Sequence, residues 1–200
     1  MLPVEVAAEL KQEGSTNPKR FDSMSVLFAD IVGFTPLSSK LSPEEVVDSL
    51  NTVFTHFDRL AEKHGVEKIR TIGDSYMAAA GVPVTREDHA QALAAMALDM
   101  LDYASGSRFS FRIGINSGPV VAGVIGAHKF QYDVWVDTVN TAYRMESHGE
   151  TGRIQISEAT NSLIRHDFAT IPRGSVEVKG KEMMDTWFIE RAQAANPGQA

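Results

Sequence analysis

The sequence predicts an α+β domain of the ferredoxin-like, split βαβ type, in which flanking helices cover an antiparallel sheet. The first observation is the order of the apolar patterns, which run strand, helix, strand, strand, helix, strand, as this fold requires. The second is composition: 43% of the 200 residues are hydrophobic and 22% are charged. That balance suits one folded domain with a short appendage.

The first strand and the first long helix have clear start and stop residues. A short, mostly apolar run over residues 25–32 ends at Gly33 and predicts a buried strand. Ser42 as the N-cap and Pro43 as the first helical residue predict a helix, which continues with apolar residues at helical spacing. Gly65 is expected to end it.

The remaining core elements follow from the same two periodicities. Residues 66–72 and 76–82 predict a hairpin around Gly73 and Asp74. A second long helix is predicted over about residues 86–104. The elements expected after it are strands at 109–116 and 120–125 with a turn at Gly118-Pro119, a helix near 139–147, and short strands around a helix near 158–165.

The two ends of the chain differ from the core in composition. Residues 3–12 predict a short amphipathic helix, and the Ala-, Asn-, Pro- and Gly-containing residues 192–200 predict a frayed tail. We therefore expect an N-terminal segment over residues 1–21, a folded domain over residues 22–191, and the tail over residues 192–200. The chain is interpreted as a piece of a longer protein.

Net charge, cysteine count and the length of apolar runs exclude several classes of function. A formal net charge of −7 argues against a nucleic-acid-binding protein, whose affinity depends on Lys and Arg neutralising phosphates. The absence of cysteine excludes disulfides and thiolate sites and fits a reducing cytoplasm. No apolar run approaches the ~20 residues of a membrane helix. We expect a cytoplasmic domain, with any membrane attachment of the full-length protein in segments outside this chain.

Two aspartates are the first candidates for chemistry. Asp30 ends the first strand, and Asp74 lies in the predicted hairpin turn. In the split βαβ topology the first strand lies beside the third, so the two carboxylates are expected to converge. Hard carboxylate oxygens on a rigid sheet suit Mg²⁺ or Mn²⁺, with substrate phosphate as a further ligand. Each aspartate alone is also explained as a turn residue, so only their joint placement favours a metal site.

Three sequence blocks resemble those of a known family. Residues 28–35 (FADIVGFT), 67–77 (EKIRTIGDSYM) and 130–145 (FQYDVWVDTVNTAYRM) resemble signature blocks of class III adenylyl and guanylyl cyclase catalytic domains. The likeness runs in order from about residue 23 to residue 189, and the chain resembles bacterial, mycobacterial-like adenylyl cyclases. It implies that residues 1–21 are a linker or transducer segment and that residues 22–191 are the catalytic domain.

This resemblance implies the class III nucleotide cyclase fold and a head-to-tail homodimer whose active sites lie at the interface. In each site, Asp30, Asp74 and the carbonyl of Ile31 would hold two Mg²⁺ or Mn²⁺ ions. The adjoining turn would bind substrate phosphates, and its residues are Gly33, Phe34 and Thr35.

The partner protomer would supply the other half of each site. The resemblance assigns this role to Asn140, Arg144 and Lys179. The ribose 3′-hydroxyl of ATP would attack the α-phosphate, which yields cyclic AMP and pyrophosphate. Asn140 and Arg144 are four positions apart and share a helix face, and a guanidinium suits the growing charge on phosphorus oxygens. They are also open to interpretation as an exposed polar face, and Lys179 as a solvated strand-end lysine.

The purine-selecting positions only partly match the adenylyl cyclase pattern. Asp133 matches it, but Arg70 stands where a Lys is usual. Arg also donates hydrogen bonds, although its bulk and fixed fork differ from those of Lys. Lys68, two residues earlier, is expected on the same strand face and is a candidate helper.

Two further departures bear on the function. Val136 stands where Gly is common, and Tyr143 replaces a small residue and would either crowd the nucleotide or stack on it. ATP remains the favoured substrate. The alternatives are a guanylyl or mixed purine cyclase, and a catalytically weak regulatory module that kept the fold.

Overall fold

The computed structural model describes residues 2–126, 128–177 and 183–191 and confirms the α+β prediction. Within these residues, eight strands form one sheet in the order β2-β3-β1-β4-β6-β8-β7, with β5 paired to β4 outside this path. All adjacent strands are antiparallel except β4 and β6. As predicted, the first strand pairs with the third.

The helices and strands have the following bounds. The helices are α1 (Val4–Glu13), α2 (Phe34–Ser38), α3 (Pro43–His64), α4 (His89–Ser105), α5 (Asp137–Ser147) and α6 (Glu158–Ile164). The strands are β1 (Lys19–Ile31), β2 (Glu67–Ile72), β3 (Ser75–Ala80), β4 (Phe111–Ile125), β5 (Gln131–Trp135), β6 (Ile154–Ser157), β7 (Thr170–Glu177) and β8 (Met183–Ile189).

Local signals set the ends of α3 as the sequence indicates. The Ser42 hydroxyl accepts the N–H of Glu45, and the Glu45 carboxylate accepts the N–H of Ser42, which completes a capping box. At the other end, Gly65 adopts a left-handed conformation with φ 62°. The capping box and the left-handed glycine thus fix both ends of the helix.

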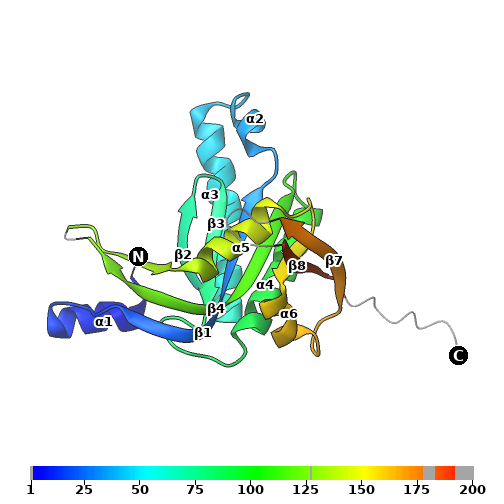
Figure 1. The fold of residues 1–200 in the computed structure, drawn as a ribbon. Coiled ribbons are helices and arrows are strands. Elements are labelled where there is room, and N and C mark those ends of the chain that lie inside the picture. The colour runs from blue at the N-terminus through cyan, green and yellow to red at the C-terminus, as the bar shows by residue number, and fades with distance from the viewer. Residues whose placement is uncertain (1, 127, 178–182, 192–200) are drawn as a thin grey trace, which may run out of the picture.

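Alternation along the central strands divides the core into two layers. In β1, Leu27, Ala29 and Ile31 belong to the apolar cluster that includes α3 and α4, whereas Val26 and Phe28 belong to a second cluster that includes Ala142 of α5. Figure 1 shows α5 across one face of the sheet and α3 and α4 on the other. The α3/α4 face and the α5 face therefore present different residues of the same strands.

Two sequence predictions about the strands are wrong. No turn divides residues 109–125, because β4 runs through Gly118 and Pro119 as one long strand. The neighbouring strand β1 is also longer than predicted, and the two pair along their length with a bulge between Phe21 and Met24. Both strands continue beyond the core as an arm to which β5 is added.

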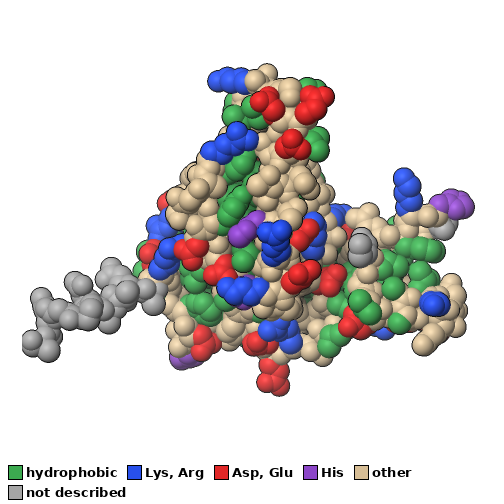
Figure 2. Space-filling model, turned by 180° about the vertical axis from the view of Figure 1, so that it is seen from behind, with side chains coloured by type: hydrophobic (Ala, Val, Ile, Leu, Met, Phe, Trp, Pro, Cys, Tyr) green, Lys and Arg blue, Asp and Glu red, His purple; other side chains and the backbone are tan. Residues whose placement is uncertain are grey.

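The surface on the α3/α4 side carries basic and acidic side chains in a mixture (Figure 2), as expected of solvated helix faces. None of the helices in the described part of the chain has the length and apolar character needed to cross a membrane.

Candidate active site

The topology brings Asp30 and Asp74 together. Asp30 pairs in register with Ser75, the residue that directly follows Asp74 at the start of β3. Burial raises the pKa of the Asp30 carboxyl, and the charge of Asp74 raises it further, against the opposing effect of Arg112. A carboxylate whose charge is disfavoured by burial and by a second carboxylate beside it is suited to a divalent cation.

A buried ion network, not predicted from the sequence, adjoins this pair. On β4, Arg112 lies opposite Asp30 in register. Its guanidinium donates from Nη2 to Asp30 Oδ2 at 3.1 Å and from Nε to Glu146 Oε1 at 3.0 Å. Burial raises the pKa of the Glu146 carboxyl to about 7, although the Arg112 hydrogen bond lowers it. Glu146 is 3% exposed and belongs to α5.

The turn after Asp30 has the backbone that its glycine permits. Gly33 adopts φ 72° and is the N-cap of the short helix α2. Gly33 and Thr35 are exposed, whereas Phe34 is 7% exposed and packs into the core. Phe34 thus fixes the turn to the core while the main chain of Gly33 and Thr35 faces outward.

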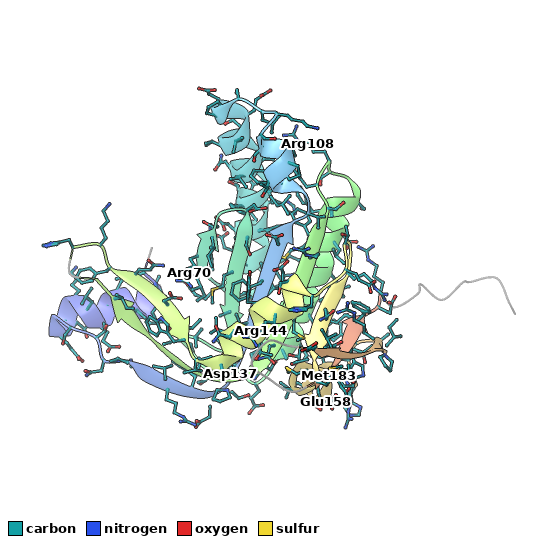
Figure 3. All side chains as sticks on the ribbon, turned by 45° about the horizontal axis from the view of Figure 1, so that its top comes forward. Arg70, Arg108, Asp137, Arg144, Glu158 and Met183 are labelled. Atoms are coloured by element: carbon teal, nitrogen blue, oxygen red, sulfur yellow. The ribbon has the colours of Figure 1, made fainter. Side chains whose placement is uncertain are left out.

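The two purine-selecting candidates contact each other. Arg70 Nη1 donates to Asp133 Oδ2 at 2.5 Å, which joins β2 to β5. Asp133 is 4% exposed, and its other oxygen accepts the N–H of Val134 at 2.9 Å. Figure 3 shows Arg70 beside the β4–β5 hairpin. Arg70 Nε is buried and has no hydrogen-bond partner among the described residues, whereas the Arg70 side chain as a whole is 37% exposed and accessible to another molecule.

Lys68 does not share a face with Arg70, contrary to the sequence prediction. The β2–β3 pairing shifts between Lys68 and Arg70, and this bulge reverses the alternation. Lys68 Nζ instead pairs with Asp58 of α3 at 2.7 Å and lies over the ring of Tyr76. It stabilises the α3/α4 face and is not a purine contact.

Helix α5 presents the two other candidates outward. Asn140 is exposed and Arg144 partly exposed, while Thr141, Ala142, Met145 and Glu146 are buried. Within the described residues, no hydrogen bond or ion pair engages either candidate side chain. Arg144 lies at the centre of Figure 3, in front of the sheet.

The two unusual residues near Arg144 have definite structural roles. Tyr143 packs edge-on against Phe28, with ring centroids 5.7 Å apart, and is 52% exposed. Val136 is the N-cap of α5 and adopts φ 93° and ψ −178°, a conformation found almost only in glycine. Val136 therefore holds the turn before α5 in a conformation that is strained for a residue with a side chain.

One candidate cannot be placed. Lys179 lies outside the described residues. Within those residues, no group of three or more His, Asp or Glu side chains forms a ready metal site. A shell around Asp30 and Asp74 would therefore need a main-chain oxygen, such as that of Ile31, and oxygens from substrate or water.

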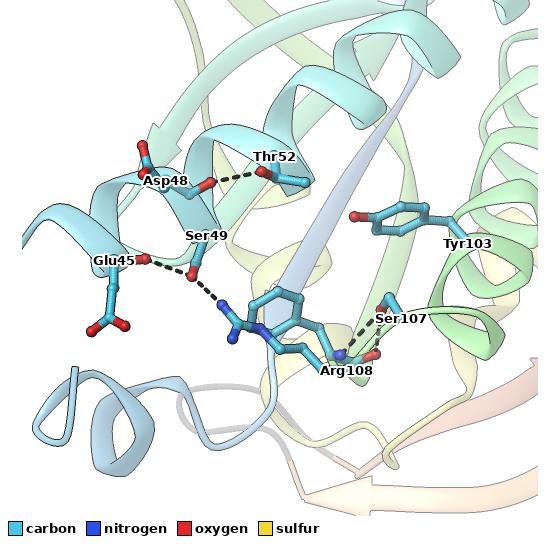
Figure 4. Close-up of a pocket in the computed structure, with 8 residues that line it drawn as sticks. Glu45, Asp48, Ser49, Thr52, Tyr103, Ser107 and Arg108 are labelled. Carbon is cyan, nitrogen blue, oxygen red and sulfur yellow. Dashed lines mark hydrogen bonds between the residues drawn. The ribbon is translucent and has the colours of Figure 1, made fainter. Parts of the chain in front are cut away.

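A separate pocket of about 350 Å³ lies between the start of α3 and the connection from α4 to β4. Figure 4 shows Arg108 donating to the hydroxyl of Ser49, which in turn donates to the Glu45 carbonyl. None of the predicted site residues lines this pocket.

Comparison with known proteins adds four findings. The family model for the adenylate and guanylate cyclase catalytic domain matches residues 16–191. An adenylate cyclase of Mycobacterium tuberculosis is 46% identical over the whole chain, which spans 47% of that relative's length. The guanylate cyclase domain of RhGC from Catenaria anguillulae in complex with GTP is 39% identical with a TM-score of 0.84, covering 88% of this chain and 100% of that one. The adenylyl cyclase CyaB from P. aeruginosa is 29% identical with a TM-score of 0.85, covering 90% and 98%.

Proposed function

Because the chain belongs to the adenylate and guanylate cyclase catalytic domain family, as its motifs indicated, we propose that it converts ATP into 3′,5′-cyclic AMP and pyrophosphate. The active sites would lie between the two chains of a head-to-tail homodimer. The chain spans about half of its mycobacterial relative, so this proposal concerns the catalytic domain of a longer protein.

The observation that carries the proposal is the orientation of α5. Glu146 is buried against Arg112, which contacts Asp30, whereas Arg144 lies two positions away along the helix. Two positions correspond to about 200° of rotation, so the Arg144 side chain leaves the helix on the side away from Asp30. One chain therefore directs its acidic pair and its Arg144 to different places, which supports sites completed by a second chain.

The carboxylate pair fits the divalent ions of such a site. Asp30, Asp74 and the Ile31 carbonyl would hold two Mg²⁺ or Mn²⁺ ions. When bound, such ions lower the pKa of the attacking hydroxyl and bind the leaving oxygens. The raised pKa of Asp30 supports this assignment, because a dication would offset both the burial and the Asp74 charge that raise it.

The other residues would bind and orient the nucleotide. Exposed backbone at Gly33 and Thr35 offers N–H groups to the phosphates. Asn140 would hold the ribose, and Arg144 would stabilise the charge that develops on the α-phosphate oxygens. Lys179 is assigned to the leaving phosphates from the sequence resemblance.

Arg70 and Asp133 would select the purine. Adenine presents an acceptor at N1 and a donor at its amino group, which complement the Arg70 guanidinium and the Asp133 carboxylate. Guanine presents a donor at N1 and an acceptor at O6, so it would meet like groups at both positions. ATP is therefore the proposed substrate.

The Arg70–Asp133 ion pair also favours a second candidate, a cyclase with mixed purine use. Arg70 and Asp133 already bond each other in the absence of a base. A purine must replace or share this contact, so the net free energy that the pair contributes to purine binding is smaller. Discrimination against GTP would then be weaker than with an unpaired site.

The experiment combines product analysis with complementation. Purified chain is incubated with ATP or GTP and Mn²⁺, and the cyclic product is identified by mass spectrometry. Asp30→Ala and Arg144→Ala are each expected to lose at least about 100-fold in rate. Their equal mixture should recover up to about a quarter of the wild-type rate, since half of the dimers are mixed and each has one intact site.

Matched controls are Asp22→Ala and Arg165→Ala, which lie at exposed positions outside the set of predicted site residues. Both should retain the wild-type rate. Absence of a cyclic nucleotide at high protein concentration would favour the regulatory-module reading. Activity without recovery in the mixture of folded variants would argue against a shared site.

A further inference from the structure

Three residues on one face of β4 contact α5 along its whole length. Asn116 Nδ2 donates to the carbonyl of Thr138 in the first turn of α5, at 2.9 Å. Two residues earlier, Gly114 lies against the last turn: a Cβ there would be 2.0 Å from the Glu146 nitrogen. Arg112, two residues earlier again, bonds the Glu146 side chain. Because these positions alternate along one strand, the face of β4 clamps both ends of the helix.

The clamp at the last turn also reaches the acidic pair. Arg112 donates Nε–H to Glu146 and Nη2–H to Asp30, at 3.0 and 3.1 Å. A guanidinium is planar and its donors have a fixed geometry, so orientation by Glu146 also fixes the donor that meets Asp30. The Glu146 side chain is only 4% exposed, whereas that of Arg112 is 31% exposed. The buried acid of α5 is therefore the anchor to which the more exposed guanidinium is bonded.

We propose that Glu146 is a positioning residue that serves both halves of the catalytic machinery of one chain. Through Arg112 it orients Asp30, and through its own backbone and side chain it sets the last turn of α5, which carries Arg144. The proposal rests on the proposed cyclase function. In the shared-site dimer, Asp30 and Arg144 of one chain belong to different active sites, so a single Glu146 acts on both sites.

A merely structural role for Glu146 predicts different behaviour. If the Glu146 carboxylate only supported packing, Glu146→Gln would keep a hydrogen bond to Arg112. Neither ion binding nor the reaction rate would then change. A positioning role requires the charge, because Arg112 shared between two carboxylates is held by both. Removing one carboxylate lets the guanidinium move toward Asp30 and compete with a divalent ion.

The first test measures ion binding without turnover. Mn²⁺ is titrated by electron paramagnetic resonance in the presence of 2′,3′-dideoxy-ATP, which lacks the attacking hydroxyl. Glu146→Ala should weaken Mn²⁺ binding about tenfold, as removal of groups that orient metal ligands commonly does, and Glu146→Gln should weaken it less. The control is Glu62→Gln on exposed α3 surface, which should bind Mn²⁺ as the wild type does. Wild-type affinity in folded Glu146→Ala would overturn the link to Asp30.

The second test uses complementation to measure separately how loss of Glu146 affects the Asp30 half and the Arg144 half of the machinery. Glu146→Ala/Arg144→Ala mixed with Asp30→Ala leaves one site that uses the Asp30 of the altered chain. Glu146→Ala/Asp30→Ala mixed with Arg144→Ala leaves one site that uses its Arg144. All homodimers are inactive in both mixtures, so the rate reports only the mixed site.

Both mixtures should be slower than the reference mixture of Asp30→Ala with Arg144→Ala. The first should need more Mn²⁺ for half-maximal rate, and the second should have a lower kcat at saturating Mn²⁺. Equality of either mixture with the reference would overturn the proposal for that half. If the reference mixture itself is inactive, the shared-site function has failed, and the Mn²⁺ titration still decides the role of Glu146.

Discussion

The two faces of the central sheet have opposite characters. On the α3/α4 face, Phe57 packs against Tyr76 and Phe111 with ring centroids 5.5 and 5.1 Å apart, and all three are fully buried. On the α5 face, Asp30 and Arg112 stand at positions that alternate with Ile31 and Phe111. The same two strands thus contribute apolar packing to both layers, and on the α5 face they also contribute the charged Asp30 and Arg112.

This difference indicates that stability and chemistry are divided between the faces. Apolar burial on the α3/α4 face is non-directional, whereas the α5 face holds a buried acid with its pKa raised to about 7. It also holds the strained Val136. A buried acid and a strained backbone both lower the stability of the fold, so they persist only where the surrounding structure compensates for them.

The largest expected effect on stability comes from the α3/α4 face. Phe57→Ala should lower the free energy of unfolding by about 3–5 kcal/mol, because a fully buried ring is lost and a cavity remains. The kcat of the folded fraction should be unchanged. Urea denaturation and cyclase assays in parallel measure both quantities.

Val47→Ala is the matched control on the same helix. Val47 is 64% exposed, so its truncation should change the free energy of unfolding by less than about 0.5 kcal/mol. A large loss of kcat in Phe57→Ala at unchanged stability would show that the two faces do not divide their roles.

The second prediction uses the pH dependence of the α5 face. Glu146 has a folded pKa of about 7 against 4.5 for the ordinary carboxyl, so the folded state binds more protons between these values. The Glu146 contribution to stability is therefore largest below pH 4.5 and is lost as the pH rises to about 7. Glu146→Gln cannot titrate. Relative to the wild type it should gain up to about 3 kcal/mol in unfolding free energy between acid pH and pH 8.

Urea denaturation at pH 5 and pH 8 measures this gain, and Glu62→Gln should show no comparable change. A variant that becomes relatively more stable at pH 8 while losing Mn²⁺ affinity would separate positioning from packing. A difference between Glu146→Gln and the wild type that does not vary with pH would contradict the burial of a titrating acid.

The third prediction tests the contact between sheet and helix. Gly114→Ala places a methyl group 2.0 Å from the Glu146 nitrogen and 2.5 Å from the Met145 carbonyl carbon, both of them backbone atoms that cannot turn aside. We expect α5 to be displaced, with about 1–3 kcal/mol lost in stability. The rate should fall about 100-fold, because Arg144 moves with the helix.

Gly106→Ala is the control, because a Cβ there meets only the Tyr103 carbonyl oxygen at 3.9 Å. Its rate should equal that of the wild type. Full activity in Gly114→Ala would mean that the depth of α5 on the sheet does not position Arg144.

The fold was largely predictable because its apolar face follows simple periods. Leu27, Ala29 and Ile31 alternate along β1, and α3 carries its own capping signals. The errors lie where local signals conflict with pairing partners far away in sequence. Gly118-Pro119 has the composition of a turn, but β1 pairs on both sides of it and keeps β4 extended.

Only those site residues that lie in a sequence motif, or that the strand order brings together, could be predicted from the sequence. Asp30 and Asp74 follow from the adjacency of the first and third strands, which the structure confirms. Arg112 lies within the stretch that resembles the family, and Glu146 directly follows the third block, but their contact depends on the depth at which α5 packs on β4. The opposite faces of Lys68 and Arg70 depend on a bulge that no single-residue signal marks.

The smallest expected effect concerns the strain at the start of α5. Val136 adopts φ 93° and ψ −178°, and a β-branched side chain in this region costs about 1–3 kcal/mol. Val136→Gly removes that strain but adds about 0.5–1 kcal/mol of unfolded-chain entropy, so a net gain of about 1 kcal/mol in unfolding free energy is expected.

Val84→Gly is the control: Val84 is also exposed but has no positive φ, so this change should destabilise the protein. Because Asn116 and Glu146 already hold α5 at both ends, relief of the strain should leave kcat unchanged. A more stable but slower Val136→Gly would instead show that the strained N-cap, and not the β4 clamp, orients Asn140 and Arg144.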